Sequence, residues 1–432
     1  MDNIKDIASY ALDELKKAGA DKASCIVAKA RKDEFNVEAN KFSLLRTLFD
    51  DSLSIKALVG GRKGVLLVNK LDKDSIDEAV AGCIELAKSA TPDEAEDIAP
   101  LVNNQNFDQT IGGMDKAKLF TRSSEYLEQV KDEFPKIILE GFTSEFNGSE
   151  SVYVNSNGVC FGRSAESYGF SSMFVAKDGD KSSSFNSAGA VLANLDAPFI
   201  SADPLHRQQL EESVKSLDTK MVDGKFTGEI IVAPTCPDLW YALDDCFLGD
   251  RALIEGTSRW KDALDTVVAD PKLTIRTIPL SPDIVKGQRY TADGFISEDM
   301  DIIKDGILKS FRIGLYAANK TGKPRSKNTA SNFEIKAGNI SLADMIKGVN
   351  RGILLNRFSG GSPSSSGEIS GVAKNSFLIE NGKITDAISE TMVSFNVLDA
   401  LKNITAISKE RNNDGHSILP WVGFGGITVS GK

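Results

Sequence analysis

Apolar residues recur three or four positions apart in three stretches of the first 134 residues, at 4–15, 76–87 and 117–134. This spacing places them on one helix face and predicts three amphipathic helices. Gly19 stands where a C-terminal cap glycine is expected after the first stretch. Cys83 falls on the apolar face of the second stretch, which predicts that its side chain is buried.

Outside these helices the pattern changes to runs rich in Val, Ile, Leu and Phe, separated by residues that favour turns. The separators are Asp-Asp at 50–51, Gly-Gly at 60–61, Asn-Gly at 147–148, and the segments 155–158 and 177–180. We expect an antiparallel meander before the second helix and long alternating strands after the third. The runs of the meander are 23–30, 34–39, 45–49, 53–59 and 64–69.

The second half is rich in glycine and in strand-favouring residues, with two further stretches of helical spacing at 236–247 and 391–407. The expected fold class is α+β, with an N-terminal antiparallel sheet carrying helices and a C-terminal β-rich domain with a few embedded helices. The predicted domains are 1–190 and 225–432, joined by a connecting segment at 191–224. The C-terminal strands are predicted at 228–233, 273–277, 306–313, 333–337, 352–356, 376–380 and 421–429.

Composition narrows the classes of protein. The 432 residues are 41% hydrophobic and 26% charged, with a net charge of −10, which suits a folded acidic protein and argues against direct nucleic-acid binding. The basic stretch at 320–327 predicts a solvated loop. No apolar run approaches the roughly 20 residues of a membrane span, and the first residues lack a signal-peptide pattern. We therefore expect a cytoplasmic protein without a membrane partner.

The five cysteines are odd in number, scattered and without a Cys-x-x-Cys pair. This pattern is typical of reduced thiols that pack as small apolar groups, and it predicts neither disulfides nor a cysteine-rich zinc site. The cysteines are Cys25, Cys83, Cys160, Cys236 and Cys246.

Candidate catalytic residues are few, because the chain has only two histidines, His206 and His416, and neither is followed by glutamate. Each is expected to be a surface residue or a hydrogen-bonded structural residue. No nucleophile elbow or phosphate-binding glycine loop is present, since the glycine run at 423–426 has Thr428 where a third glycine would fall. These glycines are expected in a strand or bulge.

A glycine- and serine-rich segment at 359–367 has two interpretations. It is either a flexible surface loop or a loop that lets the backbone of a ligand approach closely. Composition favours the surface loop.

Several short blocks of the second half follow one another in the order and spacing of the TldD/PmbA (TldE) family, which this chain resembles over roughly residues 225–432. The segment 154–158 gives weaker support in the first half. The blocks are Glu255-Gly-Thr-Ser258, Pro271-Lys-Leu-Thr-Ile275, Asp293-Gly294, Ile303-Lys-Asp-Gly-Ile-Leu-Lys309, Ser331-Asn-Phe-Glu-Ile-Lys-Ala-Gly338, Ser366-Gly-Glu368, Leu378-Ile-Glu-Asn-Gly-Lys-Ile384 and Gly426-Ile-Thr-Val-Ser-Gly431.

The resemblance implies a zinc peptidase in the TldD-type members, which carry a helical His-Glu-x-x-x-His motif shortly before the Gly-Thr-Ser block and a late cysteine ligand. This chain departs from that pattern, because the corresponding helix at 239–249 has no histidine and no cysteine follows Cys246. Asp244, Asp245 and Cys246 are imaginable substitutes, but consecutive helical residues point about 100° apart and do not converge on one ion. Catalytic, cofactor-binding and metal-binding residues are therefore all predicted as none.

The resemblance thus points to the PmbA-type (TldE-like) branch. It implies a non-catalytic subunit of a TldD/TldE-type zinc metalloprotease that acts on unfolded peptides, with a TldD-type homologue as partner and a homodimer when alone. Two alternatives stay open. One is a peptide-binding or regulatory module, as the family's label of DNA gyrase modulator suggests, and the other is an autonomous peptidase with an unrecognised site.

Overall fold

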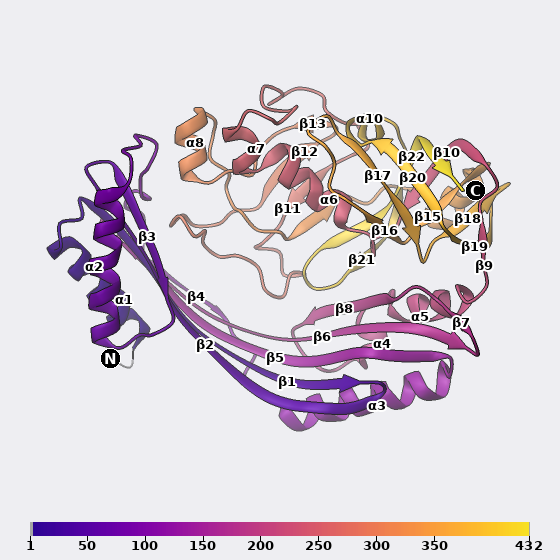
Figure 1. Cartoon of the computed structure of the whole chain (residues 1–432), viewed down its shortest axis with the longest axis horizontal. Helices are drawn as coiled ribbons and strands as arrows, with labels where there is room; N and C mark the ends of the chain where they lie inside the picture. The colour runs from indigo at the N-terminus through magenta and orange to yellow at the C-terminus, as the bar shows by residue number, and fades with distance from the viewer. Residues whose placement is uncertain (1–2, 432) are drawn as a thin grey trace.

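The computed structural model describes residues 3–431. Its first part is a strongly curved sheet of eight strands in the order β3-β2-β1-β5-β6-β4, with β7 and β8 also paired to β6 (Figure 1). Four strands of 17 to 19 residues make up most of it: β1 (Lys22–Glu38), β2 (Lys41–Val59), β5 (Ile137–Asn155) and β6 (Cys160–Asp178). The short strands are β3 (Arg62–Val68), β4 (Gln105–Gln109), β7 (Lys181–Ser182) and β8 (Asn186–Leu192).

Helices cover this sheet in two separate cores. At one end, α1 (Ile4–Lys17) and α2 (Lys73–Ser89) bury their apolar faces against β1, β2 and β5. At the other end, α3 (Lys116–Glu133) packs with α4 (Phe199–Ala202) and α5 (His206–Lys215) around an aromatic core. The segment between the two sheets therefore packs its helices onto the first sheet.

The second part is a sheet of 14 strands that lies over the concave side of the first sheet in Figure 1. Its central strands β10 (Lys225–Val232), β15 (Arg351–Leu355) and β22 (Ile418–Ser430) are apolar and buried, as expected for strands covered on both faces. The others are β9 (Thr219–Met221), β11 (Ile275–Thr277), β12 (Met300–Lys304), β13 (Ile307–Leu308), β14 (Phe333–Ile335), β16 (Arg357–Gly360), β17 (Glu368–Lys374), β18 (Phe377–Glu380), β19 (Lys383–Ser389), β20 (Thr391–Asn396) and β21 (Ile404–Asn413).

Short helices are embedded in this second sheet. They are α6 (Asp238–Leu243), a π-helical turn (Asp244–Leu248), α7 (Asp250–Ile254), α8 (Leu315–Thr321), α9 (Leu342–Gly348) and α10 (Val397–Lys402). The expected α+β class is confirmed, with an antiparallel N-terminal sheet and a β-rich second half. The domain limits at 190 and 225 stay a prediction. None of the helices within residues 3–431 is long and apolar enough to cross a membrane.

Three expectations from the local pattern are wrong. The Asp-Asp pair at 50–51 and the Asn-Gly pair at 147–148 lie inside β2 and β5, where β1 pairs with both. Pairing along these long strands outweighs the local preference for a turn. The stretch at 391–407 forms β20, the single helix α10 and the start of β21. Strand pairing of β20 with β17 and β22 outweighs its helical spacing.

Other expectations are confirmed. The segment 155–158 is the turn between β5 and β6, and Cys83 is fully buried. Gly426 has φ +77° inside β22, where the pairing register with β10 shifts, so this glycine occupies a bulge. The left-handed backbone there is accessible to glycine at low cost.

The basic stretch at 320–327 leaves the end of α8 as a loop, as predicted, with Lys320 and Lys327 exposed to solvent and Arg325 largely buried. Lys320 pairs with Asp93 of the first half at 2.9 Å. Arg325 binds Asp293 at 2.7 Å, and its guanidinium lies 3.7 Å from the centre of the Phe295 ring. Lys320 and Arg325 therefore anchor this stretch to other parts of the chain.

Candidate functional site

The helix that corresponds to the family's metal motif lies at the wall of a cleft. After α6 the chain continues through the wider π-helical turn and then breaks at Gly249, which has extended backbone angles. Leu239, Trp240 and Phe247 point into the core. The wider turn leaves Asp245 exposed on the open side. Single π-helical turns are frequent at functional sites, so this wall is a candidate for one.

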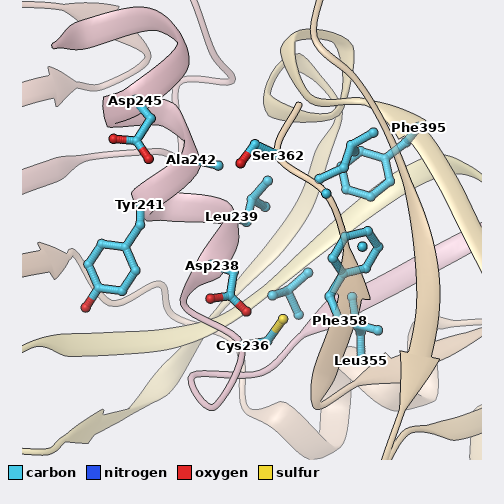
Figure 2. A pocket seen from close by; sticks show the side chains of 14 residues that line it. Cys236, Asp238, Leu239, Tyr241, Ala242, Asp245, Leu355, Phe358, Ser362 and Phe395 are labelled. Atoms are coloured by element: carbon cyan, nitrogen blue, oxygen red, sulfur yellow. The ribbon is translucent and has the colours of Figure 1, made fainter. Parts of the chain in front are cut away.

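A cavity of about 260 Å³, here called the helix cavity, separates this helix from β16. Figure 2 shows Leu239 and Cys236 on the helix side facing Phe358 and Phe395 on the opposite side. Its walls are thus largely apolar, with Asp245 at the end of the helix. Apolar walls with few polar groups are typical of ligand sites.

The glycine- and serine-rich segment at 359–367 lies partly at a cavity wall and partly at the surface. Gly360, Gly361 and Ser362 line the helix cavity, and Pro363 is buried, with its carbonyl oxygen accepting from the Cys246 thiol at 3.4 Å. The following residues, 364–366, are exposed as a surface loop should be. The first half of the loop is therefore part of the cleft wall.

A larger cavity of about 900 Å³, the acidic cavity, adjoins the helix cavity and shares Asp245 and Ser362 with it. Its charged residues come from distant segments: Asp244, Asp245, Asp250, Arg251, Asp293 and Arg312. The cavity therefore holds an excess of carboxylates over guanidinium groups.

Two of these carboxylates are tied to arginines. Asp244 Oδ1 accepts from Arg312 Nε at 2.6 Å, and Asp293 is bound by Arg325 through two nitrogens. Burial alone raises the pKa of Asp293, but the hydrogen bonds and charge of Arg325 outweigh it and hold this pKa below its ordinary value. Desolvation raises the pKa of Asp250, although the Gly314 N–H donates to it.

We expect Arg312→Ala to lower the free energy of unfolding by about 2 kcal/mol, because removal of one partner leaves buried polar groups unpaired. The Arg312 side chain is 5% exposed, and its guanidinium also donates to the carbonyl oxygens of Thr329 and Ala330. Urea titration measures the change. Asp244→Asn is the control: it keeps a hydrogen-bond acceptor and should cost about 1 kcal/mol or less. Equal stability of wild type and Arg312→Ala would contradict this.

The residues of this helix do not fit a zinc ion. Asp244 is engaged by Arg312, and Cys246 donates to Pro363. Desolvation and the charge of Asp245 raise the pKa of the Cys246 thiol, which opposes the thiolate that zinc requires. Within residues 3–431, no group of three or more His, Cys, Asp and Glu side chains is placed to hold a metal ion.

The two histidines lie far from this helix in the chain and in different surroundings. His206 is fully buried, with Nε2 3.0 Å from Tyr126 Oη and Nδ1 3.4 Å from the Phe199 carbonyl oxygen. The sequence predicted either a surface residue or a hydrogen-bonded structural residue at this position, and the second alternative is confirmed. His416 stands between the two halves, 3.3 Å from Ser331 Oγ.

Arg312 and Asp250 are site residues that sequence reasoning missed. They lie in no motif, and only the fold brings them to the helix. Asp293 was part of the Asp293-Gly294 block, so its position in the family pattern was a usable signal.

The second sheet, which carries this cleft, resembles a known family of domains. Residues 229–431 match the PmbA/TldA metallopeptidase C-terminal domain. The chain is 24% identical over 426 residues to metalloprotease PmbA of Escherichia coli O157:H7, covering 94% of this chain and 91% of that protein. A zinc metalloprotease TldD homolog of Saccharolobus solfataricus is 28% identical over 133 residues, which is 28% of this chain and 30% of the relative.

Solved structures show the same fold. TldE from Thermococcus kodakarensis superposes with a TM-score of 0.82 at 18% identity, covering 98% of this chain and all of that one. A protein from Bacteroides thetaiotaomicron, described as a modulator of DNA gyrase, gives 0.84 at 21% identity with full coverage of both chains. Residues 229–431 therefore form a C-terminal domain of the PmbA/TldD family, as the sequence blocks at 225–432 predicted.

Proposed function

We propose that this chain is the non-catalytic, PmbA/TldE-like subunit of a zinc metallopeptidase that acts on unfolded peptides in the cytoplasm, with a TldD-type homologue as its partner. The observation that carries the proposal is the composition of the helix at 238–248. At the position of the family's metal motif it has buried Leu239, Trp240 and Leu243, and its acid Asp244 is bound by Arg312. This helix supports the core and shapes the cleft.

The cleft itself supports a role in holding peptide. The helix cavity and the acidic cavity adjoin at Asp245 and Ser362, and the wall opposite the helix includes Phe358 and Gly360 of the short strand β16. An extended peptide can pair its backbone with a strand while alternate side chains enter pockets, which gives affinity with little demand on sequence. A subunit of this kind contributes substrate surface, and its partner contributes the ion.

We expect the purified chain to bind less than about a tenth of an equivalent of zinc, since a zinc site needs three or four convergent ligands. Elemental analysis after dialysis against zinc measures this.

Mixing with a TldD-type homologue should give a complex, formed mainly through residues 225–432, while the chain alone runs as a homodimer. A sizing column with light scattering measures both masses. One equivalent of zinc in the isolated chain, or no complex on mixing, would argue against the proposal.

A further inference from the structure

A third cavity, of about 530 Å³, lies between the two sheets and is here called the basic cavity. It shares Ala292 and Thr329 with the acidic cavity, so the two adjoin. Its charged residues are Arg163 from β6 of the first sheet and Lys286 from the second half. None of its lining residues within the described chain, 3–431, is an aspartate or a glutamate.

The charge of Arg163 is not neutralised by the protein. Its Nε donates to Gln109 Oε1 at 2.7 Å and its Nη2 to the Gly287 carbonyl oxygen at 3.3 Å, and both acceptors are neutral. Among residues 3–431, no carboxylate lies within ion-pair distance of it. Desolvation lowers the pKa of Arg163, and the nearby charge of Arg289 lowers it further. A partly buried arginine without an acid is costly unless a ligand supplies the anion.

Lys286 adds a second unpaired cation. Its side chain is exposed and makes no hydrogen bond or ion pair within the described residues. Desolvation lowers its pKa and the charges of Arg163 and Lys32 lower it further, although the charge of Glu145 opposes this shift. This arrangement is unusual in a chain whose net charge is −10, because acids to pair with are abundant elsewhere.

Arg163 is held by its two hydrogen bonds, and the backbone segment that carries Lys286 is tightly packed. Lys286 precedes Gly287, whose carbonyl oxygen accepts from Arg163, so the two halves of the chain meet here. A Cβ at Gly287 would stand 1.8 Å from the Pro279 carbonyl oxygen, which shows how tightly this segment is packed. The floor is Tyr290, whose ring lies 5.4 Å from that of Phe161 and whose hydroxyl is 2.8 Å from Ser151 Oγ. Such preorganisation favours ligand binding.

We propose that the basic cavity binds a carboxylate group of the peptide, which rests on the proposed function. The remaining guanidinium N–H groups of Arg163 match the geometry of a carboxylate, and Lys286 adds a point charge beside it. Asp245 and Asp250 of the adjoining acidic cavity repel a second negative charge. The cleft therefore accepts a single anionic group next to a neutral or cationic segment and disfavours a polyanion such as nucleic acid.

The test uses the full chain and an unstructured Gly/Ser/Ala peptide with an N-terminal fluorophore, in three forms. One has a free C-terminal carboxylate, one a C-terminal amide, and one the amide and a single internal glutamate. By fluorescence anisotropy, a carboxylate-bearing form should bind about tenfold or more tighter than the plain amide, the range expected of a charge-assisted pair. The free-carboxylate and glutamate forms distinguish a terminal from a side-chain carboxylate.

Variants locate the effect. Lys286→Gln and Arg163→Gln should each reduce the advantage of the carboxylate forms over the plain amide to about threefold or less. Lys383→Gln, which removes the same charge from an exposed position on β19, should retain the full advantage. The thermal midpoint reports whether Arg163→Gln folds, and Lys286→Gln, an exposed position, provides the test even if Arg163→Gln does not.

The outcomes separate the two proposals. Equal affinity for all three peptides, or an advantage that survives in Lys286→Gln, would overturn the carboxylate site and leave the subunit proposal standing. Failure of every peptide to bind, both to the chain alone and to its complex with a TldD-type homologue, would overturn both.

Discussion

An internally quenched, unstructured peptide should be cleaved by a mixture of this chain with a zinc-loaded TldD-type homologue and not by this chain alone. The expected difference is at least about a thousandfold in initial rate, because hydrolysis near neutral pH relies on a zinc-activated water and enzymes commonly gain a millionfold or more. This chain has no zinc-binding group within its described residues to generate such a water. Fluorescence release at equal protein concentrations, with and without the homologue, measures the rates.

Two controls make the result specific. Chelation of zinc should abolish the activity of the pair, and adding back zinc should restore it. His206→Phe should leave the activity of the pair intact, because His206 lies in the aromatic core beside Phe170 and Phe174 and a phenyl ring keeps that packing. Cleavage by this chain alone, at a rate that matches the pair, would show an autonomous peptidase and remove the basis of the subunit proposal.

How much of this fold was predictable depends on how far each contact reaches along the chain. The amphipathic helices α1, α2 and α3 and the hairpin turn at 155–158 followed from local spacing and turn residues. The lengths of β2 and β5 did not, because they depend on β1, which pairs with both. Local turn signals at 50–51 and 147–148 are overridden by these partners.

The cleft shows the same limit. The sequence located the helix at 239–249 and the absence of its histidines, since both are properties of one continuous segment. It did not identify Arg163, Arg312 or Lys286. These residues come from segments far apart in the chain, and only the fold brings them to the cavities. Charges that face each other across two sheets leave no periodic pattern in the sequence.

Two buried groups on α5 should give opposite pH dependence to stability. Glu212 is 7% exposed, and desolvation raises its pKa to about 7 from 4.5. Its protonated form therefore stabilises the fold fully below pH 4.5, and this contribution is lost as pH rises through about 7. Desolvation lowers the pKa of His206 to about 4 from 6.5, so stability is complete above pH 6.5 and is lost as pH falls through about 4.

Because these windows overlap between pH 4.5 and 6.5, the two effects oppose each other in the wild type, each with a size of about 3 kcal/mol. We therefore expect the unfolding free energy of Glu212→Gln to rise by about 3 kcal/mol relative to that of the wild type between pH 4.5 and pH 8. His206→Phe should gain relative to wild type by a similar amount as pH falls from 7 to 4. Urea titration across this range measures both differences.

Glu212→Gln should fold, because the partners of Glu212 are the side-chain amides of Gln208 and Asn356, at 2.7 and 2.8 Å, and each can turn to present its oxygen. Glu211→Gln is the matched control, since that neighbouring side chain is exposed and its variant should follow the wild type at every pH. Asn356 follows β15 of the second sheet, so the Glu212 contact joins the two halves between which the basic cavity lies. A pH-independent difference for Glu212→Gln would show that this carboxyl is ionised in the folded protein and that burial does not control it.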